Sequence, residues 1–223
     1  MNGFTDWHSH ILPGVDDGVR EIEDSIRILE MYEILGVRTV WCTPHIKEDF
    51  PNTPAELEAD FNGLRSVWKG NVELRLASEN MVDIVLEERL EQGMLLPLGN
   101  GLLVETSFFS PPVDLEGILD SVRSRGLFPV LAHPERYGYM TDIEYERLKE
   151  DGVLFQLNIP SLTGLYGSSA RDKAEKFLKR GWYDLAGLDL HSYNSLKHIL
   201  SSTLSEKYAD GIALLRGFEL IEA

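Results

Sequence analysis

Phe4-Thr5-Asp6-Trp7-His8-Ser9-His10, near the start of the chain, has the pattern of a short β-strand over 4–8 that ends in two histidines. Residues two apart on an extended chain project to the same face, so His8 and His10 point the same way. Imidazole is a good ligand for Zn, Fe, Mn and Cu ions, and such a pair makes half of a metal site. An isolated His-x-His is a weak signal, so the rest of the chain decides its meaning.

Short apolar runs and amphipathic segments alternate along the whole chain. The apolar runs predict strands at 4–8, 39–43, 72–77, 102–104, 127–132, 153–157 and 184–188. The amphipathic segments predict helices at 21–35, 53–67, 81–90, 114–125, 143–150 and 169–180, with one or two closing helices from 195 onward.

Seven β-then-α units in a row predict an α/β fold with parallel strands and the helices outside. We expect a TIM-like (β/α)7 barrel of about seven strands, formed by one domain over 1–223. An open doubly wound sheet is disfavoured because nothing marks a chain reversal. No G-x-G-x-x-G motif follows the first strand, which argues against a dinucleotide-binding fold.

Composition and charge restrict the possible functions. The net charge of −16 disfavours a nucleic-acid partner, because phosphate backbones are held by Lys and Arg patches. It also disfavours an acidic substrate unless bound cations reverse the local sign. No apolar run is long enough to insert into a membrane and no signal-peptide pattern is present, so we expect a cytoplasmic protein. A single cysteine, Cys42, excludes an internal disulfide framework.

Histidines and acids stand at the carboxyl ends of the predicted strands, where parallel barrels keep their active sites. Five of the six histidines lie there, and only His198 does not. The candidate ligands are His8, His10, His45, Glu79, Glu105, His133, Asp189 and His191, together with Asp16 or Asp17.

Each of these residues alone has an ordinary structural explanation: a hydrogen-bonded histidine, a helix cap, or a turn at Asp16-Asp17-Gly18. As a group at one rim, however, these residues have no ordinary structural explanation, because their charges repel. Two like charges 4 Å apart repel by about 4 kcal/mol at an effective dielectric near 20. Four carboxylates at one rim therefore need protons or cations, and the interleaved histidines favour cations.

An ordered set of residues in this chain resembles the polymerase-and-histidinol-phosphatase (PHP) superfamily. The set is Asp6-x-His8-x-His10, Asp17-Gly18, His45, Glu79, Glu105, His133 and Asp189-x-His191. More narrowly, the motifs at 8–18, 43–45 and 132–137 resemble the bacterial metal-dependent protein-tyrosine phosphatases of capsule and exopolysaccharide loci. The resemblance runs from Asp6 to about His198. It implies a distorted seven-stranded barrel with a cluster of three metal ions.

The resemblance also implies the distribution of ligands over three metal sites. The first would use His8, His10, Glu79 and Asp189; the second Asp17, His45 and His191; the third Glu79, Glu105 and His133. Asp17 is preferred over Asp16 because it directly precedes the glycine, and Asp6 would support the histidines from behind. Manganese is the expected ion, with iron or zinc as alternatives.

The same resemblance places Arg136, Asp189 and His191 in the catalytic group, with Arg136, Tyr137, Lys197 and His198 as substrate contacts. One position departs from the pattern. These phosphatases carry an Arg shortly after the Asp-x-His motif, whereas 192–199 contains only Lys197 and His198 as replacements. Phe108, Phe109 and Tyr166 could face a phenyl ring, although core or rim packing would explain each equally well.

Three functions compete at this point. The resemblance implies hydrolysis of phosphotyrosine on a protein, such as the tail of a membrane-associated tyrosine autokinase of polysaccharide export, by attack of a metal-bound hydroxide. A small-molecule phosphatase of the histidinol-phosphatase type would use the same metals. A non-catalytic barrel is the third possibility, although no ligand position is lost. A cysteine-based phosphatase is excluded, because its C-x5-R motif would require Arg where Glu48 stands after Cys42.

Overall fold

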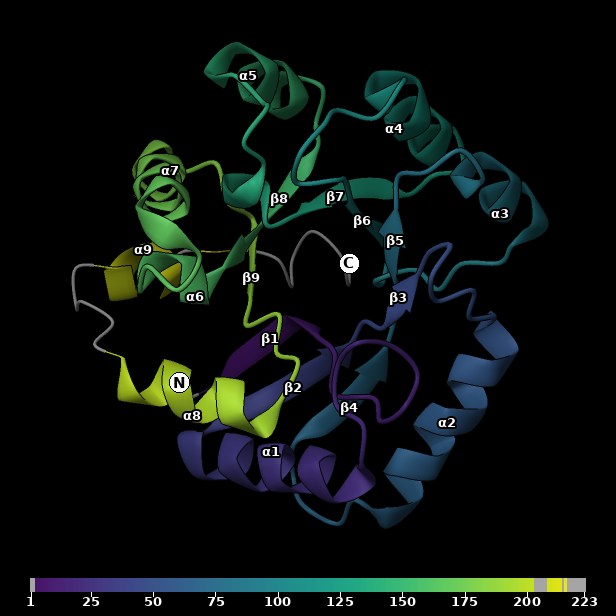
Figure 1. The fold of residues 1–223 in the computed structure, drawn as a ribbon, viewed down its shortest axis with the longest axis vertical. Helices are drawn as coiled ribbons and strands as arrows, with labels where there is room; N and C mark the ends of the chain where they lie inside the picture. Colours follow the sequence, from purple (N-terminus) through teal and green to yellow (C-terminus); the bar gives the residue numbers. More distant parts are fainter. Residues whose placement is uncertain (1–2, 203–207, 214, 216–223) are drawn as a thin grey trace.

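Short parallel strands occupy the middle of the protein and helices surround them (Figure 1). The structure is a computed structural model that describes residues 3–202, 208–213 and 215. The strands are β1 (Phe4–Ser9), β2 (Val37–Cys42), β3 (His45–Ile46), β4 (Glu73–Leu76), β5 (Glu79–Met81), β6 (Gly101–Glu105), β7 (Phe128–Ala132), β8 (Leu154–Asn158) and β9 (Leu185–Gly187). The helices are α1 (Ile22–Leu35), α2 (Pro54–Val67), α3 (Leu86–Gln92), α4 (Leu115–Ser124), the 3-10 helix η1 (Pro134–Arg136), α5 (Asp142–Glu150), α6 (Ile159–Leu162), α7 (Gly167–Arg180), α8 (Tyr193–Ser201) and α9 (Ala209–Ala213).

The predicted α/β class and parallel strand direction are confirmed, but the strands form two sheets. One has the order β1-β2-β4, and the other has the order β3-β5-β6-β7-β8-β9 and is curled. β2 and β4 match the strands predicted at 39–43 and 72–77. The short strands β3 and β5 follow them after breaks, were not predicted and pair in the other sheet, so the hydrogen bonds do not form one seven-stranded sheet. Each break lies just before a candidate ligand, so the alternation of side chains between the two faces starts again at that residue.

Main-chain hydrogen bonds continue the strand pairing across the breaks, and a further bond joins the two sheets where β9 meets β1. Ala77 N donates to Cys42 O at 2.9 Å and Glu79 N donates to Pro44 O at 3.0 Å. Beyond β9, Asp189 N donates to His8 O at 2.8 Å, which places the end of β9 beside β1 (Figure 1). A Cβ at Gly187 would lie 2.6 Å from His8 Cβ, so this approach requires glycine.

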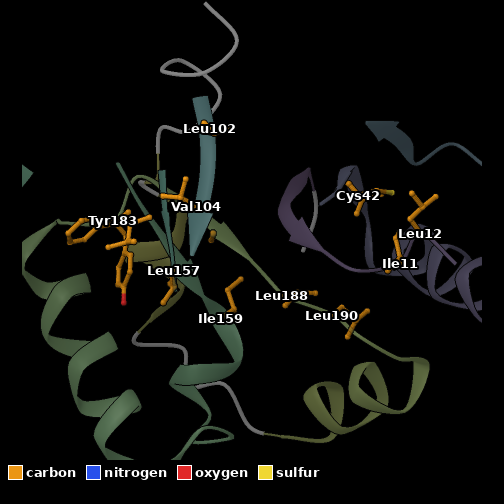
Figure 2. Packing of buried hydrophobic residues seen from close by; sticks show 14 of the residues in the cluster. Ile11, Leu12, Cys42, Leu102, Val104, Leu157, Ile159, Tyr183, Leu188 and Leu190 are labelled. Atoms are coloured by element: carbon orange, nitrogen blue, oxygen red, sulfur yellow. The ribbon is translucent and has the colours of Figure 1, made fainter. Parts of the chain in front are cut away.

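Two apolar clusters fill the protein. The smaller one draws side chains from strands of both sheets, which therefore face a common interior; its members are Trp7, Trp41, Ala77, Leu98, Leu103, Val130, Ala132, Leu154 and Leu185. The larger cluster lies between the strands and the helices. Figure 2 shows part of it, including Cys42, Leu188 and Leu190.

Local sequence explains most helix boundaries, with one correction. Thr53 and Thr141 each form a capping box that starts α2 and α5. The helix predicted from residue 81 begins only at Leu86, because Met81 pairs with Glu105 in the sheet as the last residue of β5. The predicted closing helices are α8 and α9; the final residues of the predicted 1–223 domain lie outside the described part. Within that part, no helix is both long and apolar enough to cross a bilayer.

Candidate metal centre

His8 and His10 at the end of β1 form the first donor group with two acids from distant segments. Their Nε2 atoms lie 3.1 Å apart, and each lies 3.2 Å from Glu79 Oε2. Asp189 Oδ1 lies 3.6 Å from His8 Nε2 and 3.4 Å from His10 Nε2. Ligands about 2.1 Å from a tetrahedral metal ion lie roughly 3.4 Å from one another. The spacing of the His8, His10 and Glu79 atoms therefore matches a coordination shell, and Asp189 lies beside the two imidazoles.

A second donor group lies around Asp17, beside the first. Asp17 Oδ1 is 3.4 Å from His45 Nε2 and 3.6 Å from His191 Nε2. His10 joins this group, since donor atoms of all four residues lie within 4.8 Å of one another. The resemblance did not assign His10 to the second site, so the structure adds a neighbour to the predicted set.

A third donor group gathers around Glu105 at the end of β6. His133 Nε2 is 3.0 Å from Glu79 Oε1 and 4.0 Å from Glu105 Oε2. His45 Nδ1 also approaches, at 3.1 Å from Glu79 Oε2 and 3.2 Å from Glu105 Oε1. Glu79 thus directs one oxygen toward His133 and the other toward the first group, as a bridging carboxylate would.

Unsatisfied buried atoms test whether metal ions fit these groups. His45 Nδ1 and Glu105 Oε1 are buried and have no hydrogen-bond partner among the described residues. Buried polar atoms are otherwise nearly always paired, and a site for an ion is one accepted reason for an exception. A carboxylate oxygen and an imidazole nitrogen are also the donor types that Mn, Fe and Zn ions accept. The donor set fits such ions.

The charges of the first group depend on one another. Burial by itself lowers the pKa of His8, but Glu79 and Asp189 outweigh it and raise that pKa to about 9. Burial raises the pKa of Asp189, but His8 and His191 outweigh it and lower that pKa to about 2. The imidazoles therefore hold protons that compensate the carboxylates when no metal ion does so.

The ligand histidines are oriented by groups behind them. His10 Nδ1 is 2.7 Å from Asp16 Oδ2, which also accepts a hydrogen bond from the main-chain N of His45. Asp16 therefore faces the back of His10, whereas Asp17 faces the donor groups. His8 Nδ1 lies 2.9 Å from Gln156 Oε1, which also accepts from His133 N at 3.2 Å. Outer partners of this kind fix the tautomer and the ring orientation of a ligand.

Gln156 was missed in the sequence, although a lone polar residue within a buried apolar strand was an available signal. Asp6 supports His8 through its main chain and not through its imidazole, because Asp6 Oδ1 accepts a hydrogen bond from His8 N at 3.3 Å. Its carboxylate accepts hydrogen bonds from Leu188 N at 2.9 Å and from Tyr32 Oη at 2.6 Å. Burial, opposed by these hydrogen bonds, raises its pKa to about 6. Asp6 therefore links the main chain of β1 to the end of β9 and to α1.

Two site residues adopt the left-handed backbone conformation that normally favours glycine. His133 has φ 33° and Asp189 has φ 48°, and they are the only such non-glycine residues in the described part of the chain. Side chains in this region cost on the order of 1 kcal/mol or more and cluster at functional sites. Both residues turn the chain out of a strand and toward the donor groups.

Arg136 lies between two aromatic rings at the edge of the centre. Its Nη1 donates to Asp189 Oδ2 at 2.7 Å. Its guanidinium carbon lies 4.3 Å from the centre of the Phe108 ring and 4.2 Å from that of Tyr166. Contacts with two aromatic rings and one carboxylate restrict the orientation of the guanidinium. Phe109, the residue after Phe108, is almost fully exposed.

The other three predicted substrate contacts are Tyr137, Lys197 and His198. Tyr137 is fully buried, and its hydroxyl donates to Ala132 O and accepts from Thr106 N. The expectation that it touches substrate is wrong, because no surface remains for contact. Lys197 and His198 are exposed on α8 and make no hydrogen bond or ion pair with the donor groups within the described residues. The Lys197 ammonium lies 4.9 Å from the Tyr193 ring centre instead.

Lys47 is a cation of the centre that the sequence did not single out. Its Nζ lies 3.6 Å from Glu105 Oε1, and its side chain is 16% exposed. A lysine two residues after a strand-end histidine was the available signal. Cys42, by contrast, is buried in the core, where burial raises the pKa of its thiol and makes it a poor nucleophile.

The sequence matches the family described as capsular polysaccharide synthesis, CpsB/CapC, over residues 4–209. The chain belongs to the CpsB/CapC family. It is 30% identical over 210 residues to the tyrosine-protein phosphatase CpsB of Streptococcus agalactiae, covering 87% of this chain and 83% of that relative. It is 28% identical over 196 residues to the tyrosine-protein phosphatase YwqE of Bacillus subtilis, covering 84% of this chain and 77% of YwqE.

A solved structure shows that this fold is shared within the CpsB/CapC family. The match is to a chain from crystal structures of YwqE from B. subtilis and CpsB from Streptococcus pneumoniae, described there as unique metal-dependent tyrosine phosphatases. The TM-score is 0.80 at 24% identity, over 96% of this chain and 94% of that one. At this identity the likeness establishes the fold alone.

Proposed function

We propose that this CpsB/CapC family member is a metal-dependent phosphomonoesterase that hydrolyses phosphotyrosine on a protein. One observation carries the proposal: nitrogen and carboxylate atoms from both sheets converge at 3.0–3.6 Å, while buried donor atoms among them lack hydrogen-bond partners. The names of the relatives, tyrosine-protein phosphatases, support the substrate class.

We assign the donor groups to three metal ions, with manganese as the expected ion. His8, His10, Glu79 and Asp189 would hold the first, and Asp17, His45 and His191 the second. Glu79, Glu105 and His133 would hold the third. When bound, the ions would supply positive charge to the phosphoryl oxygens and would lower the pKa of water.

The residues of the chain would position the substrate. Arg136 would hold non-bridging phosphoryl oxygens through the guanidinium edge that its two aromatic neighbours leave free. Phe108 and Tyr166, beside that cation, would form an aromatic rim that the entering phenyl ring contacts. His191, one-third exposed, lies on the open side of the centre, where it would meet the phosphate first.

The scaffold proposed for this site is a distorted seven-stranded barrel of the PHP type. In this scaffold, β2 and β3 together are one broken strand and β4 and β5 together are another. The barrel closes between β9 and β1. The hydrogen bonds at the breaks, the bond from Asp189 N to His8 O and the common interior cluster support this proposal. One domain would contain both sheets.

The proposed partner is a phosphotyrosine-bearing tail of a membrane-associated tyrosine autokinase. Membership in a capsule-synthesis family supports this choice. The reaction would take place in the cytoplasm, where ATP-dependent kinases produce phosphotyrosine. A tyrosyl tail presents an extended phenyl phosphate, which suits an aromatic rim better than a compact small-molecule ester.

The test combines chelation with a substrate panel. Thorough chelation should abolish hydrolysis of p-nitrophenyl phosphate, and Mn²⁺ should restore it, with elemental analysis of the same samples. Phosphotyrosyl peptides should then be preferred over phosphoseryl peptides and histidinol phosphate. Activity that survives chelation contradicts the metal mechanism, and preference for histidinol phosphate identifies the small-molecule alternative instead.

A further inference from the structure

Lys47 is held beside the metal-ligand groups by a tight turn. Lys47 and Phe50 exchange two main-chain hydrogen bonds, at 3.1 and 3.0 Å, directly after β3. The Phe50 ring stacks on His45 with 6.2 Å between ring centres and an interplanar angle of 12°. The Lys47 ammonium lies 5.5 Å from the centre of the same ring. The turn therefore fixes the cation relative to a candidate ligand.

The ammonium of Lys47 is close to the centre but weakly engaged there. Its nearest acid is Glu105, and the 3.6 Å separation from Oε1 is an ion pair without a hydrogen bond. Within the described residues it forms no other ion pair and no hydrogen bond. Its three N–H donors therefore have no hydrogen-bond acceptor among the described residues, and the side chain is largely buried. Coordination of Glu105 by a metal ion would leave them still more available.

Two non-histidine cations reach the carboxylates of the centre within the described residues, and they do so at different groups. Arg136 pairs with Asp189 of the first group, whereas Lys47 pairs with Glu105 of the third. Because the two cations pair with carboxylates of different donor groups, they are separate candidates for contact with a phosphate dianion at the centre. The segment after His191, where a second cation was expected, instead turns Lys197 toward Tyr193.

We propose that Lys47 is the second phosphate-binding residue of this enzyme, acting opposite Arg136. The inference rests on the proposed function, because it assigns a role toward the phosphoryl group of that substrate. A lysine ammonium suits the role, since it can donate to a tetrahedral oxyanion from any side as a compact point charge.

The experiment measures binding of inorganic phosphate to manganese-loaded protein by calorimetry, beside kcat and KM for a phosphotyrosyl peptide. Lys47→Met should weaken phosphate binding by about 10- to 100-fold, as expected for a lost hydrogen bond to a charged group, with manganese content unchanged. Lys47→Arg should restore binding to within about five-fold, because the charge is kept.

Lys149→Met is the matched control, because Lys149 is also ion-paired and similarly buried but pairs with Asp184, away from the centre. It should leave phosphate binding unchanged. An unchanged phosphate affinity in Lys47→Met, loss of manganese, or an equal effect in Lys149→Met would each overturn the proposal, as would a larger loss in Lys197→Met. Wild-type protein that binds phosphate but hydrolyses no ester would refute the proposed function while leaving the role of Lys47 measurable.

Discussion

Glu79 shows how a single carboxylate can serve neighbouring donor groups. Its Oε2 atom lies within 3.2 Å of nitrogens from His8, His10 and His45, while Oε1 faces His133. Burial alone raises the pKa of Glu79, but the surrounding imidazoles outweigh it and hold that pKa well below its ordinary range. A carboxylate that stays ionised while buried is ready to bridge two cations.

Arg136 is the residue for which the geometry gives the sharpest kinetic prediction. Arg136→Ala should lower kcat/KM for a phosphotyrosyl peptide by about 100-fold, because it removes a donor placed for the developing negative charge. Manganese content should stay unchanged, as measured by elemental analysis. Arg136→Lys should recover little of this loss, since lysine lacks the planar fork that stacks between Phe108 and Tyr166. Metal loss in Arg136→Ala would make the residue structural instead.

At the scale of elements, the breaks between β2 and β3 and between β4 and β5 place ligands inside the rim. A regular strand alternates its side chains between faces, which would send every second residue away from the centre. The breaks restart the register at His45 and at Glu79, and these two residues pair directly in the second sheet. Two donors from different strands thereby come within reach of one another.

The approach of β9 to β1 predicts a strong effect of one added methyl group. Gly187→Ala would place Cβ 2.6 Å from His8 Cβ, so the strands must separate. We expect a destabilisation of about 1–3 kcal/mol in urea unfolding, with weaker manganese binding. Gly63→Ala, in an open position on α2, is the control and should stabilise by about 0.5–1 kcal/mol. Equal stability of the two variants would contradict the proposed closure of the barrel.

At the scale of the whole molecule, protons and metal ions should compete for the same donors. The pKa of His8 is about 9 in the folded protein against an ordinary 6.5, so its protonation stabilises the metal-free fold below pH 6.5. That contribution is lost as pH rises toward 9 and amounts to about 3 kcal/mol at most. When a metal ion replaces the proton, this dependence of the free energy of unfolding on pH disappears.

Chelated protein should therefore lose stability between pH 6.5 and pH 9 in urea unfolding, whereas manganese-loaded protein should not show this loss. Chelated His8→Gln protein should show a smaller decline, because the titrating group is gone. A metal-free wild type that becomes more stable over this range would refute the charge coupling described for the first donor group.

Much of the fold and of the donor set could be predicted because both follow from local patterns. Alternating apolar and amphipathic segments indicated parallel strands, and His45 and His133 stood where strands end. The strand breaks could not be predicted, because β3 and β5 are two and three residues long and defined by distant partners. Gln156 and Lys47 had only weak local signals, because their roles, like the burial of Tyr137, depend on tertiary contacts.

The hydrogen bond between His8 and Asp189 joins positions almost a whole chain length apart. During synthesis, His8 and His10 leave the ribosome long before the segment that carries Asp189 and His191. The growing polypeptide therefore exposes the imidazole pair until that later segment emerges, and the proposed first coordination shell can form only then. Binding of the proposed first ion is therefore expected only after both β1 and the segment that follows β9 have been synthesised.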